Sequence, residues 1–552
     1  MSRDANPALE AASAPNSALR GADLIARRLA EAGCRFAFGI PGGEVLALFD
    51  ALSRAGLRVV TSRHENSAGF MAEGTYHATG APGVLVATIG PGVSNAVNVV
   101  AHAHQDRVPL LVLTGCIDAH DRGSYTHQIF DHRAVLAPLT KATFSVDADS
   151  IAATIDAAVT LAMSDPPGPV HLDVPIGVGR GAARESLESN TKPIARVSAE
   201  PARLSVWRER LTAAERPLIL AGVEAVQQDA AEVLRALVDA TGAPIITTYK
   251  GKGLVDERSA SSLGAAGLSP AADALLLPLV RAADVVVLAG YDPIEMRIGW
   301  RRPFEPDAAV LELASVLPTH GMYTATETLI GDLRAHLRAI TTPTRGAVWA
   351  DRRPAKVRAA LTAAFAAETD VFGPLAIAHA LRAAVPSDAV ITVDTGAHRI
   401  ALSQAYACHS AHLMLQSSGL CTMGCALPLA IGRKLAEPTR AVVAVVGDGG
   451  LDMTLGELAT ARDLGTAIVI VVVDDASLAL IELKQRKDGF ANLAVDSGRT
   501  RYADVARALG GYGVVAEDAQ ALGDAVRAGL ARDDTFTLVH CPIARRSYDT
   551  RI

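Results

Sequence analysis

The chain of 552 residues lacks any clustered run of Lys and Arg, and its formal net charge is −7. Because binding to a phosphate backbone needs clustered basic side chains, we do not expect nucleic acid as a partner and favour small molecules. No apolar run reaches the roughly 18 residues of a membrane-spanning helix. Residues 1–18 also contain no apolar signal core. The sequence therefore predicts a cytoplasmic protein that does not contact a membrane.

Cysteine is scarce and dispersed. Of the six cysteines, only Cys421 and Cys425 lie close together in the sequence. A structural zinc site needs more ligands than this pair offers, so we interpret the cysteines as core thiols of a protein in a reducing compartment.

The chain is too long for one hydrophobic core. Hydrophobic residues make up 50% and charged residues 20%, which is typical of well-buried α/β domains. Repeated strand-then-helix patterns predict an α/β fold with three doubly wound parallel-sheet domains. The predicted division is a mobile tail at 1–19, a first domain at 20–185, a middle domain at 186–345 and a third domain at 346–552. The first and third domains share one plan, and the middle domain differs.

Two acidic loops in the third domain each follow an apolar strand. One begins with Asp448, followed by Gly449 and Gly450, and the other contains Asp475. A spacing of one helix and one strand brings both carboxylates to the same edge of a parallel sheet, where they are suited to bind Mg²⁺. The two glycines leave backbone N–H groups open to an anion, so a diphosphate bridged by the cation is a natural ligand. The alternative is a pair of acidic turns that cap two helices, and the loops alone do not decide.

Glu65 lies near the end of an apolar strand in the first domain, before a helix start of small and apolar residues. A carboxyl group in such a low-dielectric site can donate or share a proton near neutral pH. The alternative is a glutamate that stabilises the helix N-terminus.

Glycine turns at residues 41–43 and 90–92 do not form a dinucleotide-binding motif. Neither gives G-x-G-x-x-G between a strand and a helix with an acidic residue after the next strand. A nicotinamide enzyme is therefore not favoured.

Together, the motif Gly447-Asp448-Gly449, the acidic pair Asp474-Asp475 and the segment Arg63-His64-Glu65 resemble those of thiamine-diphosphate enzymes of the pyruvate oxidase and acetolactate synthase group. The resemblance covers residues 20–545. Family members carry a pair of Asn where this chain has Asp474-Asp475. The first and third domains would then bind the pyrimidine and the diphosphate of the cofactor.

The resemblance implies a metal site and a diphosphate site in the third domain. Asp448, Asp475 and the backbone carbonyl of Ser477 would hold Mg²⁺. Gly449 and Gly450 would receive the diphosphate.

Further roles are implied for the rest of the cofactor. Met423 would be the apolar wedge that bends it, Gly396 would contact it, and His398 would face its diphosphate. Glu65 would exchange a proton with its pyrimidine ring, and Gln128 would face its thiazolium ring as a second catalytic residue.

Within the group, four segments resemble flavin-independent, catabolic-type acetolactate synthases: residues 126–128, 138–141, 289–295 and 394–398. The flavin-associated segment of other relatives is replaced by Gly290-Tyr291-Asp292-Pro293-Ile294. We therefore expect thiamine diphosphate and Mg²⁺, and no FAD.

The resemblance implies decarboxylation of a small 2-oxo acid followed by carboligation, with a homodimer or homotetramer forming the active sites. The alternatives are a decarboxylase that does not ligate and a synthase with an unusual acceptor. An alternative of another class is a non-catalytic subunit that binds thiamine diphosphate.

Overall fold

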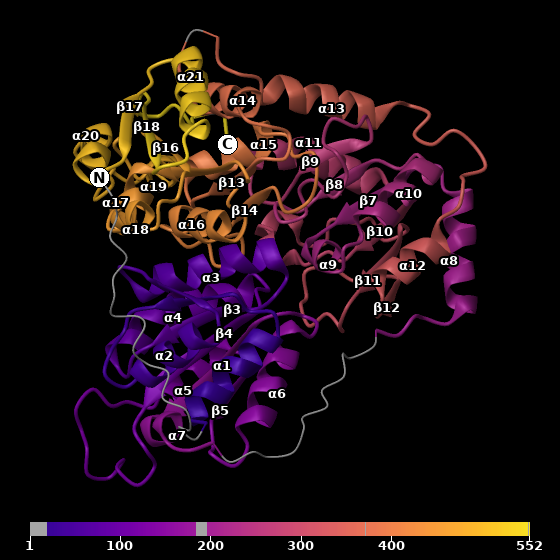
Figure 1. Cartoon of the computed structure of the whole chain (residues 1–552). Helices are drawn as coiled ribbons and strands as arrows, with labels where there is room; N and C mark the ends of the chain where they lie inside the picture. Colours follow the sequence, from indigo (N-terminus) through magenta and orange to yellow (C-terminus); the bar gives the residue numbers. More distant parts are fainter. Residues whose placement is uncertain (1–18, 184–195, 370, 550) are drawn as a thin grey trace.

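The computed structural model describes residues 19–183, 196–369, 371–549 and 551–552. Except for Leu19, the predicted mobile tail lies outside these residues, as do residues 186–195 at the start of the predicted middle domain. In Figure 1 the first domain (indigo to violet) lies below the third (orange to yellow), and the middle domain lies to the right. The domain boundaries stay predictions.

The first domain is a six-stranded parallel sheet in the order β2-β1-β3-β4-β6-β5. Its strands are β1 (Phe36–Gly39), β2 (Arg58–Thr61), β3 (Gly83–Ala87), β4 (Leu110–Cys116), β5 (Ala142–Ser145) and β6 (Pro169–Pro175). Its helices are α1 (Gly21–Glu31), α2 (Leu46–Arg54), α3 (Glu65–Thr79), α4 (Pro91–Gln105), α5 (His132–Leu136), α6 (Ile151–Met163) and α7 (Ile176–Arg180). The central strands β3, β4 and β6 are buried throughout, as expected of a parallel sheet covered on both faces.

The middle domain has a different strand order, β12-β11-β10-β7-β8-β9. Its strands are β7 (Pro217–Ala221), β8 (Ile245–Thr247), β9 (Ser262–Ala265), β10 (Val285–Ala289), β11 (Ala309–Ala314) and β12 (Glu327–Ile330). Its helices are α8 (Pro201–Ala213), α9 (Val223–Gln227), α10 (Ala231–Thr241), α11 (Pro270–Ala282) and α12 (Leu333–Ile340). Read from β9, this is the order of the dinucleotide-binding doubly wound fold.

The third domain repeats the strand order of the first, β14-β13-β15-β16-β18-β17. Its strands are β13 (Val390–Val393), β14 (Met414–Gln416), β15 (Val442–Gly447), β16 (Val469–Asp474), β17 (Tyr512–Val515) and β18 (Thr537–Pro542). Its helices are α14 (Pro374–Ala384), α15 (Ala397–Ala405), α16 (Ala426–Ala436), α17 (Asp448–Thr454), α18 (Glu457–Asp463), α19 (Ala479–Lys487), α20 (Tyr502–Ala508) and α21 (Ala519–Leu530), and α13 (Arg353–Ala364) precedes them. The prediction of an α/β fold with three doubly wound parallel sheets is confirmed.

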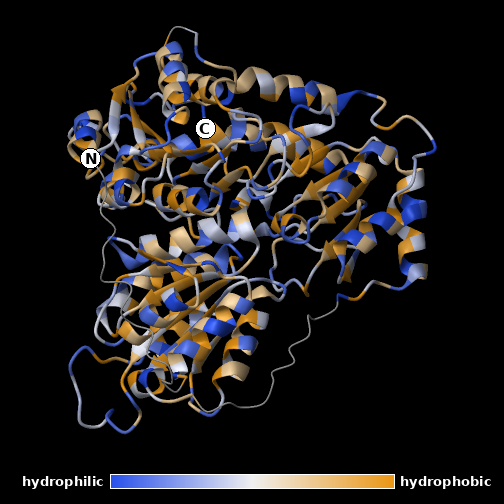
Figure 2. Ribbon diagram, in the orientation of Figure 1, coloured by the Kyte–Doolittle hydropathy of each residue, from blue (hydrophilic) through white to orange (hydrophobic). Residues whose placement is uncertain are grey.

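Hydropathy follows these layers. In Figure 2 the strands inside each domain are largely orange, while blue residues gather on the outer faces of the helices. None of the helices in the described part of the chain has both the length and the apolar character needed to span a membrane.

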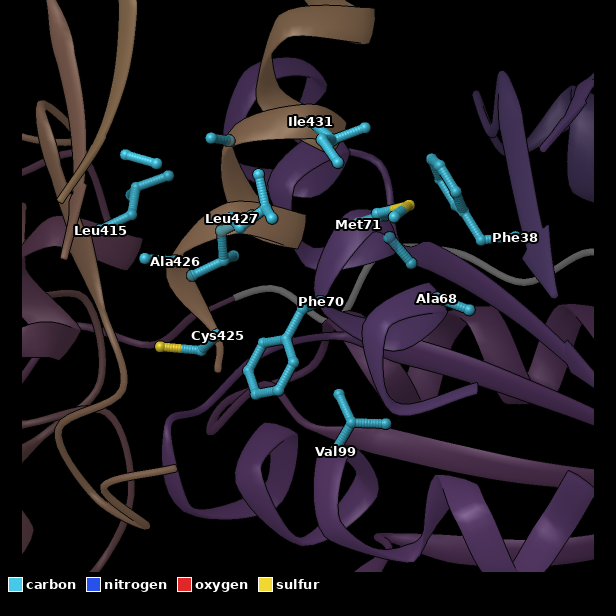
Figure 3. Packing of buried hydrophobic residues seen from close by; sticks show 14 of the residues in the cluster. Phe38, Ala68, Phe70, Met71, Val99, Leu415, Cys425, Ala426, Leu427 and Ile431 are labelled. Atoms are coloured by element: carbon cyan, nitrogen blue, oxygen red, sulfur yellow. The ribbon is translucent and has the colours of Figure 1, made fainter. Parts of the chain in front are cut away.

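Helices α3 and α16 join the first and third domains at very close range. A Cβ atom on Gly74 would lie 2.4 Å from the carbonyl oxygen of Leu429, and one on Gly432 would lie 2.0 Å from that of Met71. Only glycine fits between backbones at such distances. Figure 3 shows Leu427 and Ile431 beside Met71 and Phe70, all within one buried cluster. The two domains therefore share a continuous hydrophobic core.

A buried charged cluster joins the first domain to the other two. His102 Nε2 lies 2.7 Å from Glu73 Oε2, and His102 Nδ1 lies 3.0 Å from Asp106 Oδ2. Lys250 Nζ, from the middle domain, lies 2.7 Å from Asp106 Oδ1, and the N–H of Ser418, from the third domain, donates to the same oxygen at 2.8 Å. Burial opposes a charge on His102, but Asp106 and Glu73 outweigh burial and raise its pKa to about 9.

Candidate functional site

A cavity of about 140 Å³ opens at the carboxyl edge of the third sheet. All of the predicted cofactor residues apart from Glu65 line it: Gly396, His398, Met423, Asp448, Gly449, Gly450, Asp475 and Ser477. Open α/β sheets bind ligands at this edge. The cavity is therefore the candidate cofactor site, and the roles of its residues stay predictions.

Strand register brings the two acidic loops together. β15 and β16 are neighbouring parallel strands, and Gly447 pairs with Val473 at their carboxyl ends. Asp448 follows Gly447 as the first residue of α17, and Asp475 directly follows the end of β16. The sequence spacing of these carboxylates therefore translates into proximity in space.

The electrostatics of the two carboxylates favour a bound cation. Burial and then the charge of Asp448 raise the pKa of Asp475 to about 7, and burial also raises the pKa of Asp448. Asp475 Oδ2 is buried and has no hydrogen-bond partner among the described residues. A divalent cation would relieve the repulsion between the two carboxylates, and this oxygen would serve as one of its ligands.

The other acid of the pair, Asp474, turns away from the cavity. Its Oδ2 lies 2.8 Å from His540 Nε2, and its Oδ1 accepts the N–H of Ala476 at 2.9 Å. Burial opposes a charge on Asp474, but these hydrogen bonds outweigh it and lower its pKa. Only Asp475 of the acidic pair therefore lines the cavity.

His398 contributes an unpaired nitrogen. A Cβ atom on Gly396 would lie 2.7 Å from its ring, and one on Gly447 would lie 3.0 Å away, so both glycines make room for the imidazole. Burial, followed by the charge of Arg399, lowers the pKa of His398 to about 3. Its Nε2 atom is buried without a hydrogen-bond partner in the described part of the chain. A neutral imidazole can donate one hydrogen bond to an anion in the cavity.

Asp394 fixes the loop that carries Met423. Its Oδ1 accepts the N–H of Gly424 at 2.8 Å and that of Thr395 at 2.6 Å. A Cβ atom on Gly450 would lie 2.7 Å from Asp394 Oδ2, so the α17 backbone can approach only because that residue is glycine. The apolar side chain of Met423 is thereby held at the cavity wall.

Tyr548, in the C-terminal segment, lines the cavity and was not predicted from the sequence. Glu482 accepts hydrogen bonds from Arg545 Nε and Arg546 Nε, each at 2.9 Å, and from the hydroxyl of Ser477 at 2.7 Å. This clamp brings the buried Tyr548 to the cavity wall. Only long-range contacts place it there, so no local pattern could have indicated it.

Glu65 and Gln128 lie in the first domain and do not line the cavity. Glu65 is buried at the start of α3, where its Oε2 accepts a hydrogen bond from Asn95 Nδ2 at 3.0 Å. Gln128 is exposed and has a left-handed backbone with φ of 60°. Within one chain, therefore, Glu65 and Gln128 do not share a cavity with the other predicted site residues.

Two further residues of the first domain, His64 and Lys141, form hydrogen bonds within that domain. His64 Nδ1 accepts the N–H of Asn66 at 3.1 Å and so caps α3. Lys141 Nζ donates to the carbonyl and hydroxyl of Ser164 at 2.7 and 2.8 Å, and burial lowers its pKa to about 8.

Comparison with protein families covers all three domains. The model of the thiamine pyrophosphate enzyme N-terminal TPP binding domain matches residues 19–135, that of the central domain matches 205–340, and that of the C-terminal TPP binding domain matches 394–541. The chain belongs to the thiamine pyrophosphate enzymes. The cavity lies in the C-terminal TPP binding domain of this family, and Glu65 lies in the N-terminal one.

Relatives of this thiamine pyrophosphate enzyme match most of its length. It is 30% identical over 530 residues to the acetolactate synthase of Bacillus subtilis, which covers 93% of this chain and 91% of the relative. It is 31% identical over 533 residues to the catabolic acetolactate synthase of Raoultella terrigena, covering 93% of each. A probable 2-ketoarginine decarboxylase of Pseudomonas aeruginosa is 31% identical over 486 residues, which is 85% of this chain and 84% of the relative. Membership of the acetolactate synthase group, predicted from the resemblance, is confirmed.

The polar groups that line the cavity fit thiamine diphosphate and a cation. His398 Nε2 and the backbone N–H groups at the start of α17 are suited to a diphosphate, and the unpaired oxygen of Asp475 is suited to its cation. The residues predicted to bind the diphosphate therefore all lie in the third domain.

Proposed function

We propose that the protein decarboxylates a small 2-oxo acid and joins the resulting two-carbon or longer unit to a second carbonyl compound, as an acetolactate synthase does. Thiamine diphosphate supplies the electron sink for loss of CO₂ when bound. The observation that carries the proposal is the cavity in which Asp448, Asp475 and His398 converge. The two acetolactate synthases that match nearly the full chain support the reaction type.

Mg²⁺ is the proposed cation. Asp448, Asp475 and the carbonyl of Ser477 would bind it, because hard divalent cations prefer oxygen ligands. Gly449, Gly450 and His398 would hold the diphosphate, and Met423 and Gly396 would contact the rest of the cofactor. We expect no FAD, and flavin absorption in the purified protein would overturn that expectation.

Glu65 would hold and return a proton at the pyrimidine ring, and Gln128 would contact the substrate side of the thiazolium ring. Because neither residue lines the cavity of its own chain, we propose that a second copy contributes them. A homodimer, or a homotetramer built from two such dimers, would complete the sites with closed symmetry.

The test is incubation with thiamine diphosphate, Mg²⁺ and a panel of 2-oxo acids, with products identified by NMR. Pyruvate alone is expected to give acetolactate. Production of acetaldehyde alone, or no reaction of pyruvate, would contradict the acetolactate assignment.

A second candidate is decarboxylation without ligation. The probable 2-ketoarginine decarboxylase supports it, since its 31% identity is as high as the 30% and 31% of the two synthases, although over a shorter part of the chain. Including a guanidino-bearing 2-oxo acid in the panel separates the candidates, because an aldehyde product without a ligated product identifies a decarboxylase. The third candidate is a non-catalytic subunit. Glu65 is an argument against it, because a purely binding role needs no proton-transfer group.

A further inference from the structure

A buried hydrogen-bonded network lies at the carboxyl edge of the first sheet. His132 Nδ1 lies 2.9 Å from Asp173 Oδ1, at the end of β6. The hydroxyl of Thr114 donates to the same oxygen at 2.6 Å and lies 2.8 Å from His171 Nε2. The N–H of Gly90 donates to His132 Nε2 at 3.3 Å. All of these side chains are buried.

The hydrogen bonds fix where the protons of this network are. His132 Nε2 accepts from Gly90, so the imidazole donates from Nδ1 to Asp173. Thr114 donates to Asp173, so its oxygen accepts from His171 Nε2. Each donor therefore has one acceptor, and His132 is held in a single tautomer and orientation.

His132, His171 and Asp173 also have the residue types of a metal site. One pair of their polar atoms lies too close together for two ligands of the same ion. Ligands of a tetrahedral zinc ion are about 3.3 Å apart, given bonds of about 2.0 Å. His132 Nδ1 and Asp173 Oδ1 are 2.9 Å apart, which is a hydrogen-bond length. The cluster is therefore a hydrogen-bonded relay.

The acceptor end of the relay meets the segment that carries Gln128. A Cβ atom on Gly90 would lie 2.4 Å from the carbonyl oxygen of Gln128, so the turn and this segment touch backbone to backbone. Gly90 has φ of 69° and ψ of −100°, and Gln128 has φ of 60°. Both residues therefore have positive φ, which is uncommon for residues other than glycine. Two residues further along, in the first turn of α4, a Cβ atom on Gly92 would lie 3.4 Å from Glu65 Oε1.

We infer that His132, oriented by Asp173, is a positioning residue that clamps the Gly90 turn against the Gln128 segment and so sets the geometry of Gln128 for the reaction. The role of Gln128 rests on the proposed function. The clamp itself rests on the distances given above. His132 acts through Gly90 and Gln128 and does not line the cofactor cavity.

Two substitutions separate the ends of the relay. In His132→Asn, the side-chain amide can still reach Asp173 but loses the acceptor for Gly90. In His132→Gln, the longer side chain restores an acceptor near the position of Nε2. The matched control is His336→Asn in the middle domain, because His336 is also buried and its Nε2 accepts the N–H of Ala199 at 2.8 Å.

The measurements are steady-state kinetics with the 2-oxo acid, cofactor affinity by fluorescence titration, and hydrogen exchange of the peptides that contain Gly90 and residues 118–131. For His132→Asn we expect kcat to fall about tenfold or more, with KM and cofactor affinity within about twofold of wild type. Exchange in both peptides should rise. His132→Gln should recover most of kcat. His336→Asn should leave kcat, KM, cofactor affinity and the exchange of both peptides unchanged, even where it lowers the stability of the protein.

The inference is overturned if His132→Asn keeps kcat within twofold and leaves the exchange of both peptides unchanged. It is also overturned if His336→Asn lowers kcat as much, since the effect would then be one of general stability. If the asparagine variant does not fold, Asp173→Asn is measured instead, with a fall in kcat and faster exchange expected. If wild type turns over no 2-oxo acid, the proposed function fails and the exchange measurement alone decides on the clamp.

Discussion

The first and third domains have the same strand order, but the polar side chains at the carboxyl edges of their sheets differ in whether they have hydrogen-bond partners. In the first, Glu65 is bonded to Asn95, and His132 is bonded to both Asp173 and Gly90. In the third, Asp475 Oδ2 and His398 Nε2 are buried without partners in the described residues. An unpaired buried polar atom costs free energy unless a ligand satisfies it. The unpaired atoms at the third edge are therefore suited to a ligand, whereas the side chains named at the first edge bond to one another.

The largest effect is expected from a substitution at the carboxyl edge of the first sheet, which tests whether Glu65 transfers a proton in the reaction. Glu65→Gln keeps the side-chain volume and removes the exchangeable proton, so turnover should fall by about 10²–10⁴-fold. Steady-state kinetics measures this, with the exposed Glu31→Gln as the control. Unchanged turnover in Glu65→Gln would show that the first edge has no proton-transfer role.

The next effect concerns the seam between the two domains. In Gly432→Ala the new methyl group would meet the carbonyl oxygen of Met71 at 2.0 Å, so α3 and α16 must separate. We expect the free energy of unfolding to fall by about 1–3 kcal/mol. Urea unfolding measures it, and Gly43→Ala is the control because a Cβ atom there meets nothing within 4 Å. Equal stability of the two variants would contradict the close contact.

The third edge is tested by exchanging its acids separately. Asp475→Asn should keep activity but weaken Mg²⁺ binding about tenfold, because it removes one ligand charge. Asp474→Asn should change Mg²⁺ affinity less, since Asp474 is turned to His540. Titration of the apoprotein with Mg²⁺ and cofactor measures both. Complete loss of activity in Asp475→Asn with the cofactor still bound would contradict this assignment.

The smallest effect is a pH dependence of stability from the buried cluster of Glu73, His102 and Asp106. The pKa of Glu73 is lowered from 4.5 to about 2, because His102 outweighs burial, so its contribution is present above pH 4.5 and lost as pH falls towards 2. The pKa of His102 is raised from 6.5 to about 9, so its contribution is complete below pH 6.5 and lost as pH rises through 9. Urea unfolding midpoints should therefore show this contribution in full only between about pH 4.5 and 6.5. His102→Gln should flatten the alkaline side, and an unchanged slope would contradict the charge assigned to His102.

Sequence patterns predicted the third edge better than the first. Asp448 and Asp475 follow continuous apolar strands, and the rules of parallel sheets turn that spacing into proximity. Their neighbour Asp474 could not be assigned, because its contact with His540 spans 66 positions and depends on where β18 lies. Tyr548 and the pairing of His132 with Asp173 also depend on tertiary packing. Family resemblance supplied Met423 and His398, which no local pattern would have distinguished.

The contact between α3 and α16 has a consequence for communication between active sites. Helix α3 begins at Glu65, and α16 begins three residues after Met423. In the proposed dimer these two ends serve different cavities. One closely packed pair of helices would then link the cofactor cavity of its own chain to Glu65 of the same chain, which would act in the cavity of the second copy. If loading of one cavity shifts this pair of helices, it would alter the affinity of the other cavity, and cofactor binding by the dimer would be cooperative.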